Sequence, residues 1–365
     1  MFKIKKSEGE KLLEKGGLKK FFRRFGISLG IIIIIGTICI GILWRNEIVA
    51  LSSLKQINDG VKNYPFYTMT YKGNYGFDDY LEMGSKSAAE YKQFILKEIT
   101  NGLDGVFKRE PPNCSSFTVV MPNGDKIFAR NLDTNIAIPL FLKTNSKGYK
   151  SMSMVNLRDL GIDIKKLPLS LSRGSINMLG APYVPLEGMN EHGLAISILT
   201  AGGSRAMIKK NKSTLNEFSL IRMVLDKAST VEEAVKMIEN YNMNFLSPQH
   251  PSHFMIADAT GASVVIEYLK GELQTIYSNK PYHIVTNFVL YNNPSGGFGL
   301  DRYQGIEAKL KETKGILTEK QALKLLEENT ISGDEQWSAV YNLTQKRVSI
   351  CVGKDYKTIH EFGLN

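Results

Sequence analysis

Twenty consecutive residues without a charge, Phe25–Trp44, limit how this chain can fold more than any other feature. As a helix, that length is enough to cross a hydrocarbon core of about 30 Å. Nine Lys/Arg and three Glu precede it in residues 1–24, and the positive-inside rule places such a segment in the cytoplasm. We therefore predict a basic cytoplasmic tail (1–24), a single transmembrane helix (25–44) and an extracellular remainder at the cell membrane.

A cleaved signal peptide is the alternative, since it also begins with basic residues followed by an apolar run. No small-x-small cleavage site follows the run, and the run is long. Both observations favour an uncleaved anchor.

The basic tail also explains most of the net charge of +10, because it contributes +6 of it. The remaining chain has an ordinary charge and no nucleic-acid-binding motif, so we expect no nucleic-acid partner. The five histidines are scattered without metal-ligand spacing. Neither a metal nor another cofactor is expected, and we assign the histidines to surface or supporting positions.

A hairpin is predicted at residues 113–133, NCSSFTVVMPNGDKIFARNLD. Two apolar runs flank the turn signal at Asn123–Asp125. The second run brings Arg130 and Asp133 back beside Cys114, which begins the first run. A thiol flanked by a cation and a carboxylate suggests a nucleophile, whereas the plainer interpretation is a solvated hairpin.

The other two cysteines are expected to be unreactive. Cys39 lies in the apolar run, and Cys351 lies in a strand-like run where it reads as a buried apolar residue. A disulfide between Cys114 and Cys351 is the alternative for a chain outside the cytoplasm.

The order of elements predicts an α+β fold in which helices cover sheets. Residues 45–113 read as a helical leader ending at two prolines, and 114–365 as the main domain. Short β-rich runs dominate that domain, with a last hairpin at its end. Helices are expected after Thr230 and Thr318, each at capping-box spacing. Residues 144–182 lack a pattern and are expected to be long loops.

Polar residues also occur beside turns or strand ends at three later places, Asn190 in EGMNEHGLAIS, Asn287 in HIVTNFVL and Arg302 in GFGLDRYQGIE. In order, C-x15-RNLD, MNEHGLA, VTN, the later arginine and WSAVY at Trp337–Tyr341 resemble the choloylglycine hydrolase group of N-terminal-nucleophile amidases. That group includes bile salt hydrolases and penicillin V acylases. It is related to acid ceramidase, N-acylethanolamine acid amidase and isopenicillin N acyltransferase.

The resemblance implies a four-layer αββα sandwich and a catalytic role for Cys114. In this group the free α-amine of the nucleophile acts as the base, and its pKa of about 8 lies near that of a thiol. Arg130 would lower the thiol pKa and Asp133 would hold the α-ammonium. By the same resemblance, the Asn287 side chain and the Asn190 backbone N–H would bind the oxyanion, and Arg302 would support the nucleophile.

Because 113 residues precede Cys114, the resemblance further implies self-cleavage at Asn113–Cys114, as in the acid ceramidase and acyltransferase branches. The leader would then become a separate subunit. Gly73–Leu81 also resembles the leader of that branch.

The sequence thus predicts a membrane-anchored extracellular amidase that hydrolyses a linear, non-peptide C–N bond of a small-molecule N-acyl compound. Acyl transfer to an amine and an inactive ligand-binding ectodomain are the alternatives. The acyl group is not specified, and a homo-oligomer is left open.

Overall fold

The computed structural model describes residues 20, 22–31, 34–35, 41–42, 44–57, 65–100, 113–134, 137–162, 176–201, 208–209, 211–292, 295–331 and 335–364. The chain divides into two compact units, Met1–Ile48 and Val49–Asn365. The predicted anchor falls in the first unit, and part of it lies outside the described residues.

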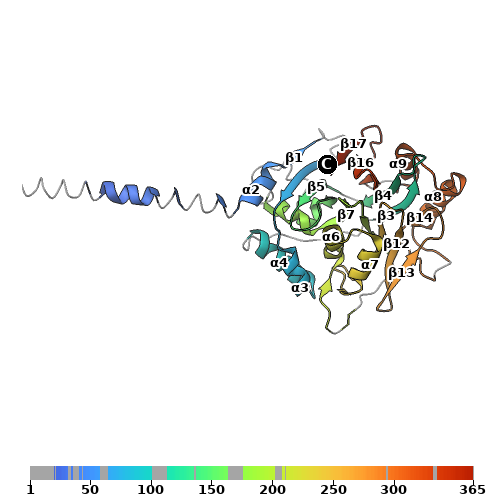
Figure 1. Ribbon diagram of the computed structural model, residues 1–365, viewed down its shortest axis with the longest axis horizontal. Coiled ribbons are helices and arrows are strands. Elements are labelled where there is room, and N and C mark those ends of the chain that lie inside the picture. The colour runs from blue at the N-terminus through green and yellow to red at the C-terminus, as the bar shows by residue number, and fades with distance from the viewer. Residues whose placement is uncertain are drawn as a thin grey trace, which may run out of the picture. The chain divides into compact units, whose positions relative to one another are not determined.

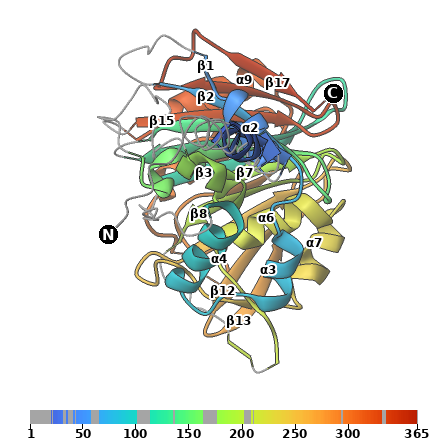
Figure 2. The same cartoon turned by 90° about the vertical axis from the view of Figure 1, so that its left-hand side faces the viewer.

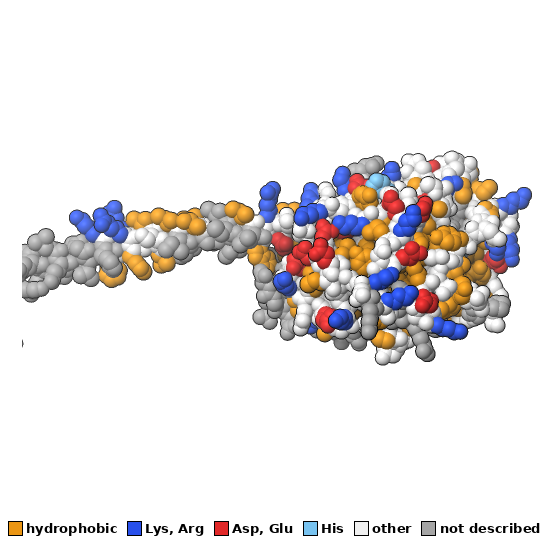
Figure 3. Space-filling view, turned by 60° about the horizontal axis from the view of Figure 1, so that its bottom comes forward, with side chains coloured by type: hydrophobic (Ala, Val, Ile, Leu, Met, Phe, Trp, Pro, Cys, Tyr) orange, Lys and Arg blue, Asp and Glu red, His pale blue; other side chains and the backbone are white. Residues whose placement is uncertain are grey.

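In the first unit, residues 22–31 are helical and their apolar side chains are exposed, among them Phe25 and Ile31. Figure 3 shows basic side chains at the start of this segment and apolar ones along it. Among the described residues, no helix combines the length and the apolar character needed to span a bilayer. The transmembrane helix therefore stays a prediction. The first described helix with assigned bounds, α2 (Arg45–Ser52), continues into the second unit.

The second unit contains two large β-sheets (Figure 1). In its described part, the larger sheet has nine strands in the order β1 (Lys55–Gln56), β2 (Tyr67–Lys72), β5 (Pro139–Asn145), β6 (Ser151–Asn156), β7 (Pro185–Asn190), β8 (Ala195–Thr200), β11 (Ser252–Ala257), β12 (Ser263–Leu269) and β13 (Glu272–Tyr277). All neighbours in it are antiparallel except β2 and β5, which run parallel.

The smaller sheet has six strands in the described residues, and all its neighbours are antiparallel. Their order is β14 (His283–Val285), β3 (Asn113–Val120), β4 (Lys126–Thr134), β15 (Glu335–Asn342), β16 (Arg347–Val352) and β17 (His360–Gly363). A short parallel pair, β9 (Thr214–Leu215) and β10 (Asn242–Met243), lies apart from both sheets.

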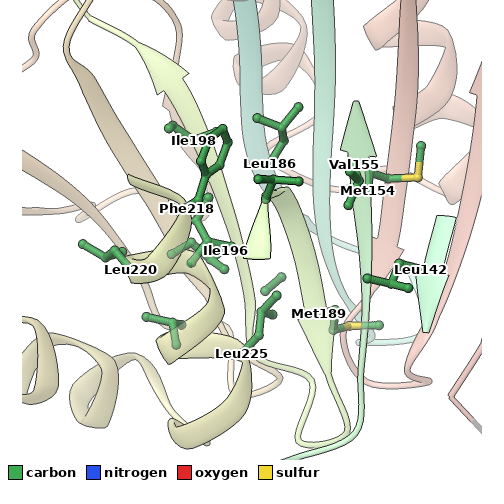
Figure 4. Packing of buried hydrophobic residues seen from close by; sticks show 14 of the residues in the cluster. Leu142, Met154, Val155, Leu186, Met189, Ile196, Ile198, Phe218, Leu220 and Leu225 are labelled. Atoms are coloured by element: carbon green, nitrogen blue, oxygen red, sulfur yellow. The ribbon is translucent and has the colours of Figure 1, made fainter. Parts of the chain in front are cut away.

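Helices cover the outer faces of the two stacked sheets (Figures 1 and 2). On the larger sheet, α6 (Glu217–Lys227) packs against β7 and β8 and is followed by α7 (Val231–Ile238). Figure 4 shows Phe218 of α6 beside Ile196 and Ile198 of β8. Gly188 permits this close packing, because a Cβ there would lie 2.9 Å from Leu225 Cδ1 and 2.4 Å from a backbone oxygen of β6.

On the smaller sheet, α8 (Leu300–Glu312) and α9 (Glu319–Glu328) form a second core with β3 and β4. Phe117 and Ala129 face these helices, whereas Phe128 and Leu132 belong to the main core. This alternation follows from the two-residue period of a strand. It gives each strand of the hairpin one face toward the helices and one toward the larger sheet.

The leader residues Val49–Thr100 belong to the second unit rather than forming a domain of their own. They add β1 and β2 to the larger sheet and pack α3 (Phe77–Met83) and α4 (Ala88–Thr100) beside it (Figure 2). Their buried aromatic residues include Tyr75, Tyr80 and Tyr91, which join the main core. Tyr75 OH donates to Asp226 Oδ2 at 2.6 Å.

The fold confirms the predicted mixed α+β class with stacked sheets. The hairpin turn is present, with Gly124 at φ +91°, and Thr230 and Thr318 are helix N-caps. The expectation of long loops over residues 144–182 is wrong for the described part of that range, because β6 and the 3₁₀ helices η2 (Leu157–Leu160) and η4 (Met178–Tyr183) form there. Residues 163–175 lie outside the described residues. The chain also ends one strand later than predicted, at β17.

Candidate functional site

The β3–β4 hairpin brings Cys114 and Arg130 together. Cys114 lies opposite Leu132, and Arg130 lies opposite Ser116. Alternation therefore points both side chains toward the larger sheet. Arg130 Nη2 donates to Cys114 Sγ at 3.3 Å, and both side chains are fully buried.

The larger sheet fixes the Arg130 guanidinium in this position. Nη1 donates to Leu186 O at 2.9 Å and to the Glu187 carboxylate, while Nη2 donates to Ile198 O at 2.8 Å. With the thiol, these acceptors match the four N–H groups on the two Nη atoms. The guanidinium is therefore held by β7 and β8 while it contacts Cys114.

Glu187 is a site residue that the sequence analysis missed. Its Oε1 accepts from Trp337 Nε1 at 3.2 Å and from Tyr341 OH at 3.1 Å, and its side chain is fully buried. The sequence resemblance includes the WSAVY motif but does not indicate what its side chains contact. These two bonds show that Trp337 and Tyr341 of the motif contact Glu187. The sequence signal that could have indicated Glu187 is its position as the single carboxylate in β7, a strand that is otherwise uncharged.

Two effects oppose each other on the thiol. Burial raises the pKa of the Cys114 thiol, and Arg130 lowers it by its charge and its hydrogen bond, with burial prevailing. The expected lowering by Arg130 is thus present but outweighed in the intact chain. Burial likewise raises the pKa of the Glu187 carboxyl, against the lowering by Arg130, Trp337 and Tyr341.

Asn287 and Arg302 hold the main chain of Cys114. Asn287 Oδ1 accepts from Cys114 N at 2.9 Å, and Arg302 Nη1 donates to Cys114 O at 2.6 Å. Arg302 also donates to Ser115 Oγ at 2.9 Å and to Asn287 Oδ1 at 2.7 Å. The left-handed N-cap Gly299, φ +84°, starts α8 so that this arginine in its first turn reaches β3.

The side-chain amide of Asn287 has a second N–H group besides the one that bonds the main chain. Its Nδ2 donates to Thr200 O at 2.8 Å, and an amide nitrogen carries two N–H groups. In the described part of the chain, the second N–H has no recorded acceptor. Asn287 thus combines an acceptor for the Cys114 nitrogen with a donor suited to an oxyanion.

A buried His–Glu pair holds the segment that carries Asn287. His253 Nε2 lies 2.7 Å from Thr286 O, and Nδ1 lies 3.0 Å from Glu267 Oε1. Glu267 also accepts from Leu290 N and Tyr291 N, so the segment is held on both sides of Asn287. Although burial raises it, the pKa of the Glu267 carboxyl lies below its usual range, mainly through His253.

Asp133 is buried in β4 directly opposite Asn113, the residue before Cys114. Its negative charge is one of the influences that raise the pKa of the Cys114 thiol, which places it close to that group. This position beside the Asn113–Cys114 bond is the one that the hairpin predicts.

The structure does not bring Asn190 into this cluster, which corrects its predicted role. Its backbone N–H donates to Leu194 O at 3.0 Å within the β7–β8 turn, so it is already occupied. Its Nδ2 donates to Leu225 O and Ala228 O at the end of α6. Asn190 is therefore a turn residue that ties the hairpin to a helix.

Cys114 and Cys351 are free thiols, so the alternative of a disulfide between them is wrong. Burial raises the pKa of Cys351 to about 12, as expected for an unreactive core residue. Within the described ranges, no three His, Cys, Asp or Glu residues are grouped as a metal site would require.

Comparisons with known proteins agree with this geometry. The family described as "Linear amide C-N hydrolases, choloylglycine hydrolase family" matches residues 114–330. Penicillin V acylase of Pectobacterium atrosepticum is 32% identical over 111 residues, which is 28% of this chain and 29% of that protein. Bile salt hydrolase/transferase of Clostridium perfringens is 24% identical over 174 residues, 46% of this chain and 51% of that protein. These matches span at most about half of either relative's length.

Among solved structures, conjugated bile acid hydrolase from Clostridium perfringens matches with a TM-score of 0.49 and 16% identity, covering 69% of this chain and 93% of that one. Penicillin V acylase from Agrobacterium tumefaciens matches with a TM-score of 0.46 and 17% identity, covering 68% and 85%. The family match spans more than half of the sequence and begins at the predicted nucleophile. The chain belongs to the choloylglycine hydrolase family of linear amide C–N hydrolases.

Proposed function

We propose that this chain hydrolyses a linear, non-peptide C–N amide bond of an N-acyl compound, with Cys114 as its nucleophile. The observation that carries the proposal is the set of bonds around one residue. Arg130 contacts the thiol, while Asn287 and Arg302 contact the main-chain nitrogen and oxygen of Cys114. In a member of an amidase family, this arrangement suits attack on an amide carbonyl.

Activation requires that the Asn113–Cys114 bond break first. Sγ attacks the Asn113 carbonyl carbon, the C–N bond breaks, and a thioester forms. Water then hydrolyses the thioester, which leaves a carboxylate on Asn113 and an α-amine on Cys114. The buried carboxylate of Asp133, opposite Asn113, is suited to hold that group as an ammonium ion.

In turnover, the α-amine takes the proton from Sγ and the thiolate attacks the substrate carbonyl. The second N–H of the Asn287 amide stabilises the resulting oxyanion. The leaving amine takes the proton from the α-ammonium, and water releases the acyl group from the thioester. No histidine is needed as a base, because the amine pKa of about 8 is close to that of a thiol.

The first experiment is a screen of N-acyl compounds that measures release of the free amine. Penicillin V, conjugated bile salts and N-acyl lipids cover the names of the relatives and the amphipathic class that a membrane tether favours. Wild type should release amine from at least one compound. Cys114→Ala should release none, and Cys351→Ala, the matched control, should behave like wild type.

Acyl transfer is the second candidate, because the Clostridium perfringens relative is named both hydrolase and transferase. It uses the same thioester, with an amine in place of water as the acceptor. Adding a second amine to the reaction distinguishes the two, since transfer gives a new amide at the expense of the free acid. A chain with neither cleavage nor turnover would instead be a ligand-binding ectodomain.

We also propose that residues 25–44 anchor the enzyme with residues 45–365 outside the cell. The uncharged run, the basic residues before it and the exposed apolar side chains of residues 22–31 support this. Protease added to intact cells should degrade or release the second unit and leave the tail intact. Protection of the whole chain would reverse the topology, and a soluble protein beginning near residue 45 would indicate a cleaved signal.

The leader should retain the catalytic piece after self-cleavage. Strand β2 pairs with β5 over six residues, from Tyr67–Leu140 to Lys72–Asn145. Tyr75 bonds Asp226, and Tyr91 OH donates to Tyr183 O. The two pieces should therefore co-purify in mild detergent and separate only on denaturation.

A further inference from the structure

A buried polar layer lies between the two sheets directly behind the nucleophile. It contains the Arg130–Glu187 ion pair, both side chains of which are fully buried, and the Ser116–Ser197 hydroxyl pair at 3.1 Å. Ion pairs removed from water are costly unless their geometry and hydrogen bonds are good. Both partners of this pair are also bonded to further groups of the two sheets, which raises the question of what the pair does for the thiol.

The hydrogen bonds around Glu187 favour its ionised form, against the burial that raises the pKa of its carboxyl. Arg130, Trp337 and Tyr341 all donate hydrogen bonds to the carboxylate oxygens. A protonated carboxyl would need an acceptor for its own O–H, and these neighbours are all donors in their present bonds. The group therefore carries a negative charge, held by residues from β4 and β15.

The guanidinium lies between this carboxylate and the thiol. One of its terminal nitrogens contacts Glu187 and the other contacts Cys114 Sγ. A cation alone beside a thiol favours the thiolate, whereas a carboxylate on the far side of that cation opposes it. Glu187 consequently affects both where the guanidinium points and how much positive charge the thiol experiences.

We propose that Glu187 is a positioning residue that aims Arg130 at the thiol and balances its charge, so that Cys114 keeps its proton until self-cleavage provides an amine. The proton then passes from Sγ to the α-amine, giving a thiolate and an ammonium ion. Trp337 and Tyr341 act through Glu187 by holding its carboxylate. The part concerning the amine rests on the proposed function, but the effect on the thiol does not.

The test is an ultraviolet titration of the Cys114 thiolate in the purified full chain, which requires no substrate. The matched Cys114→Ala protein is subtracted in each background, and intact mass confirms that compared samples are in the same cleavage state. Glu187→Gln removes the negative charge. It should raise the acid dissociation constant of the thiol about tenfold or more, because a neighbouring charge shifts a pKa by about 1–3 units.

Ser197→Ala is the control, because it removes a buried hydroxyl from the same layer and leaves Glu187 and its hydrogen bonds in place. It should change the thiol dissociation constant by less than about twofold, since that constant follows the charge. A Glu187→Gln thiol as weak as wild type, or weaker, would overturn the charge-balancing role. An equally large change in Ser197→Ala would also do so, because it would indicate a general loss of packing.

If Glu187→Gln does not fold, Glu187→Asp keeps the charge and withdraws the carboxylate by one methylene group. We then expect kcat to fall about tenfold or more with little change in KM, since the guanidinium would be misplaced. Wild-type kcat in Glu187→Asp would overturn the positioning role. Should no variant or wild type turn over any substrate, the proposed function fails. The thiol titration of Glu187→Asp still decides the positioning role: a lower dissociation constant, as the guanidinium leaves the thiol, supports it, and a constant equal to that of wild type overturns it.

Discussion

Arg130 and Arg302 reach Cys114 from different regions of the molecule. Arg130 comes from β4 and lies between the sheets, where it donates to the thiol. Arg302 comes from the first turn of α8 and donates to the carbonyl oxygen of the same residue. One arginine therefore contacts the sulfur atom of Cys114, and the other contacts the main chain of the same residue.

Their other partners differ in the same way. Arg130 is paired with the buried carboxylate of Glu187. The recorded acceptors of Arg302 in the described chain are neutral oxygens, those of Cys114, Ser115 and Asn287. We infer that Arg130 affects the ionisation of the thiol. Arg302 fixes the position of the Cys114 main chain relative to Asn287.

The largest expected effect concerns Cys114, the residue that both arginines contact. Cys114→Ala should abolish amide hydrolysis while the protein stays folded, because only one buried sulfur atom is lost. Amine release and the free energy of unfolding are to be measured together. Activity above a few per cent of wild type on any substrate would remove the nucleophile from the account.

Asn287→Ala tests the region of Arg302. We expect kcat to fall about 10²–10³-fold with a smaller rise in KM, because an oxyanion donor acts mainly in the transition state. Steady-state kinetics on the best substrate provide the measurement. An unchanged kcat would make Asn287 only a link between Arg302 and Cys114.

The two arginines should also differ in their contribution to stability. Arg130→Ala leaves the Glu187 charge buried without its partner and should cost about 3–5 kcal/mol. Arg302→Ala removes hydrogen bonds to neutral oxygens and should cost about 2 kcal/mol. Urea unfolding measures both, and a larger cost for Arg302→Ala would contradict the distinction.

A double variant sharpens the same comparison. Adding Glu187→Gln to Arg130→Ala should recover part of the lost stability, since the unpaired charge is removed. No matched carboxylate exists among the recorded partners of Arg302. If the losses of unfolding free energy in the two single variants simply add up in the double variant, Arg130→Ala does not act by breaking the ion pair.

The smallest effect lies on β14, at a site that neither arginine contacts. Burial lowers the pKa of His283 to about 4, and the only polar contact recorded for its ring in the described chain is with Ser263 Oγ, at 3.1 Å. The unfolded chain takes up this proton near pH ~6.5. The stabilising contribution is thus present above that pH and is lost as pH falls toward 4.

The free energy of unfolding at pH ~5.5 should be about 1 kcal/mol lower than at pH ~7 through His283. His283→Gln should remove that share of the pH dependence, and an unchanged profile would assign it elsewhere.

The parts of the site that local rules determine were predictable from sequence. The turn at Asn123–Asp125 and the two-residue period of the flanking runs place Arg130 beside Cys114. Asn287 and Arg302 came only from the order of their motifs, since each bonds Cys114 across more than 170 residues of chain. Periodicity contains no information about such contacts.

Three errors have related physical causes. Glu187 was missed because its partners come from β4 and β15, which no local pattern connects to β7. Asn190 was assigned to the site because a turn asparagine and a site asparagine look alike in sequence. Strand β6, SMSMVN, was missed because it is buried throughout and so lacks the polar alternation of a half-exposed strand.

In the proposed mechanism, Cys114 acts as the N-terminal residue of the catalytic piece. Intact mass with N-terminal sequencing of active protein tests whether it does. We expect two co-purifying pieces, residues 1–113 and 114–365, the second beginning at Cys114, with one uncut chain for Cys114→Ala. An active enzyme that remains a single uncut chain would contradict the amine-base mechanism and the role assigned to Cys114.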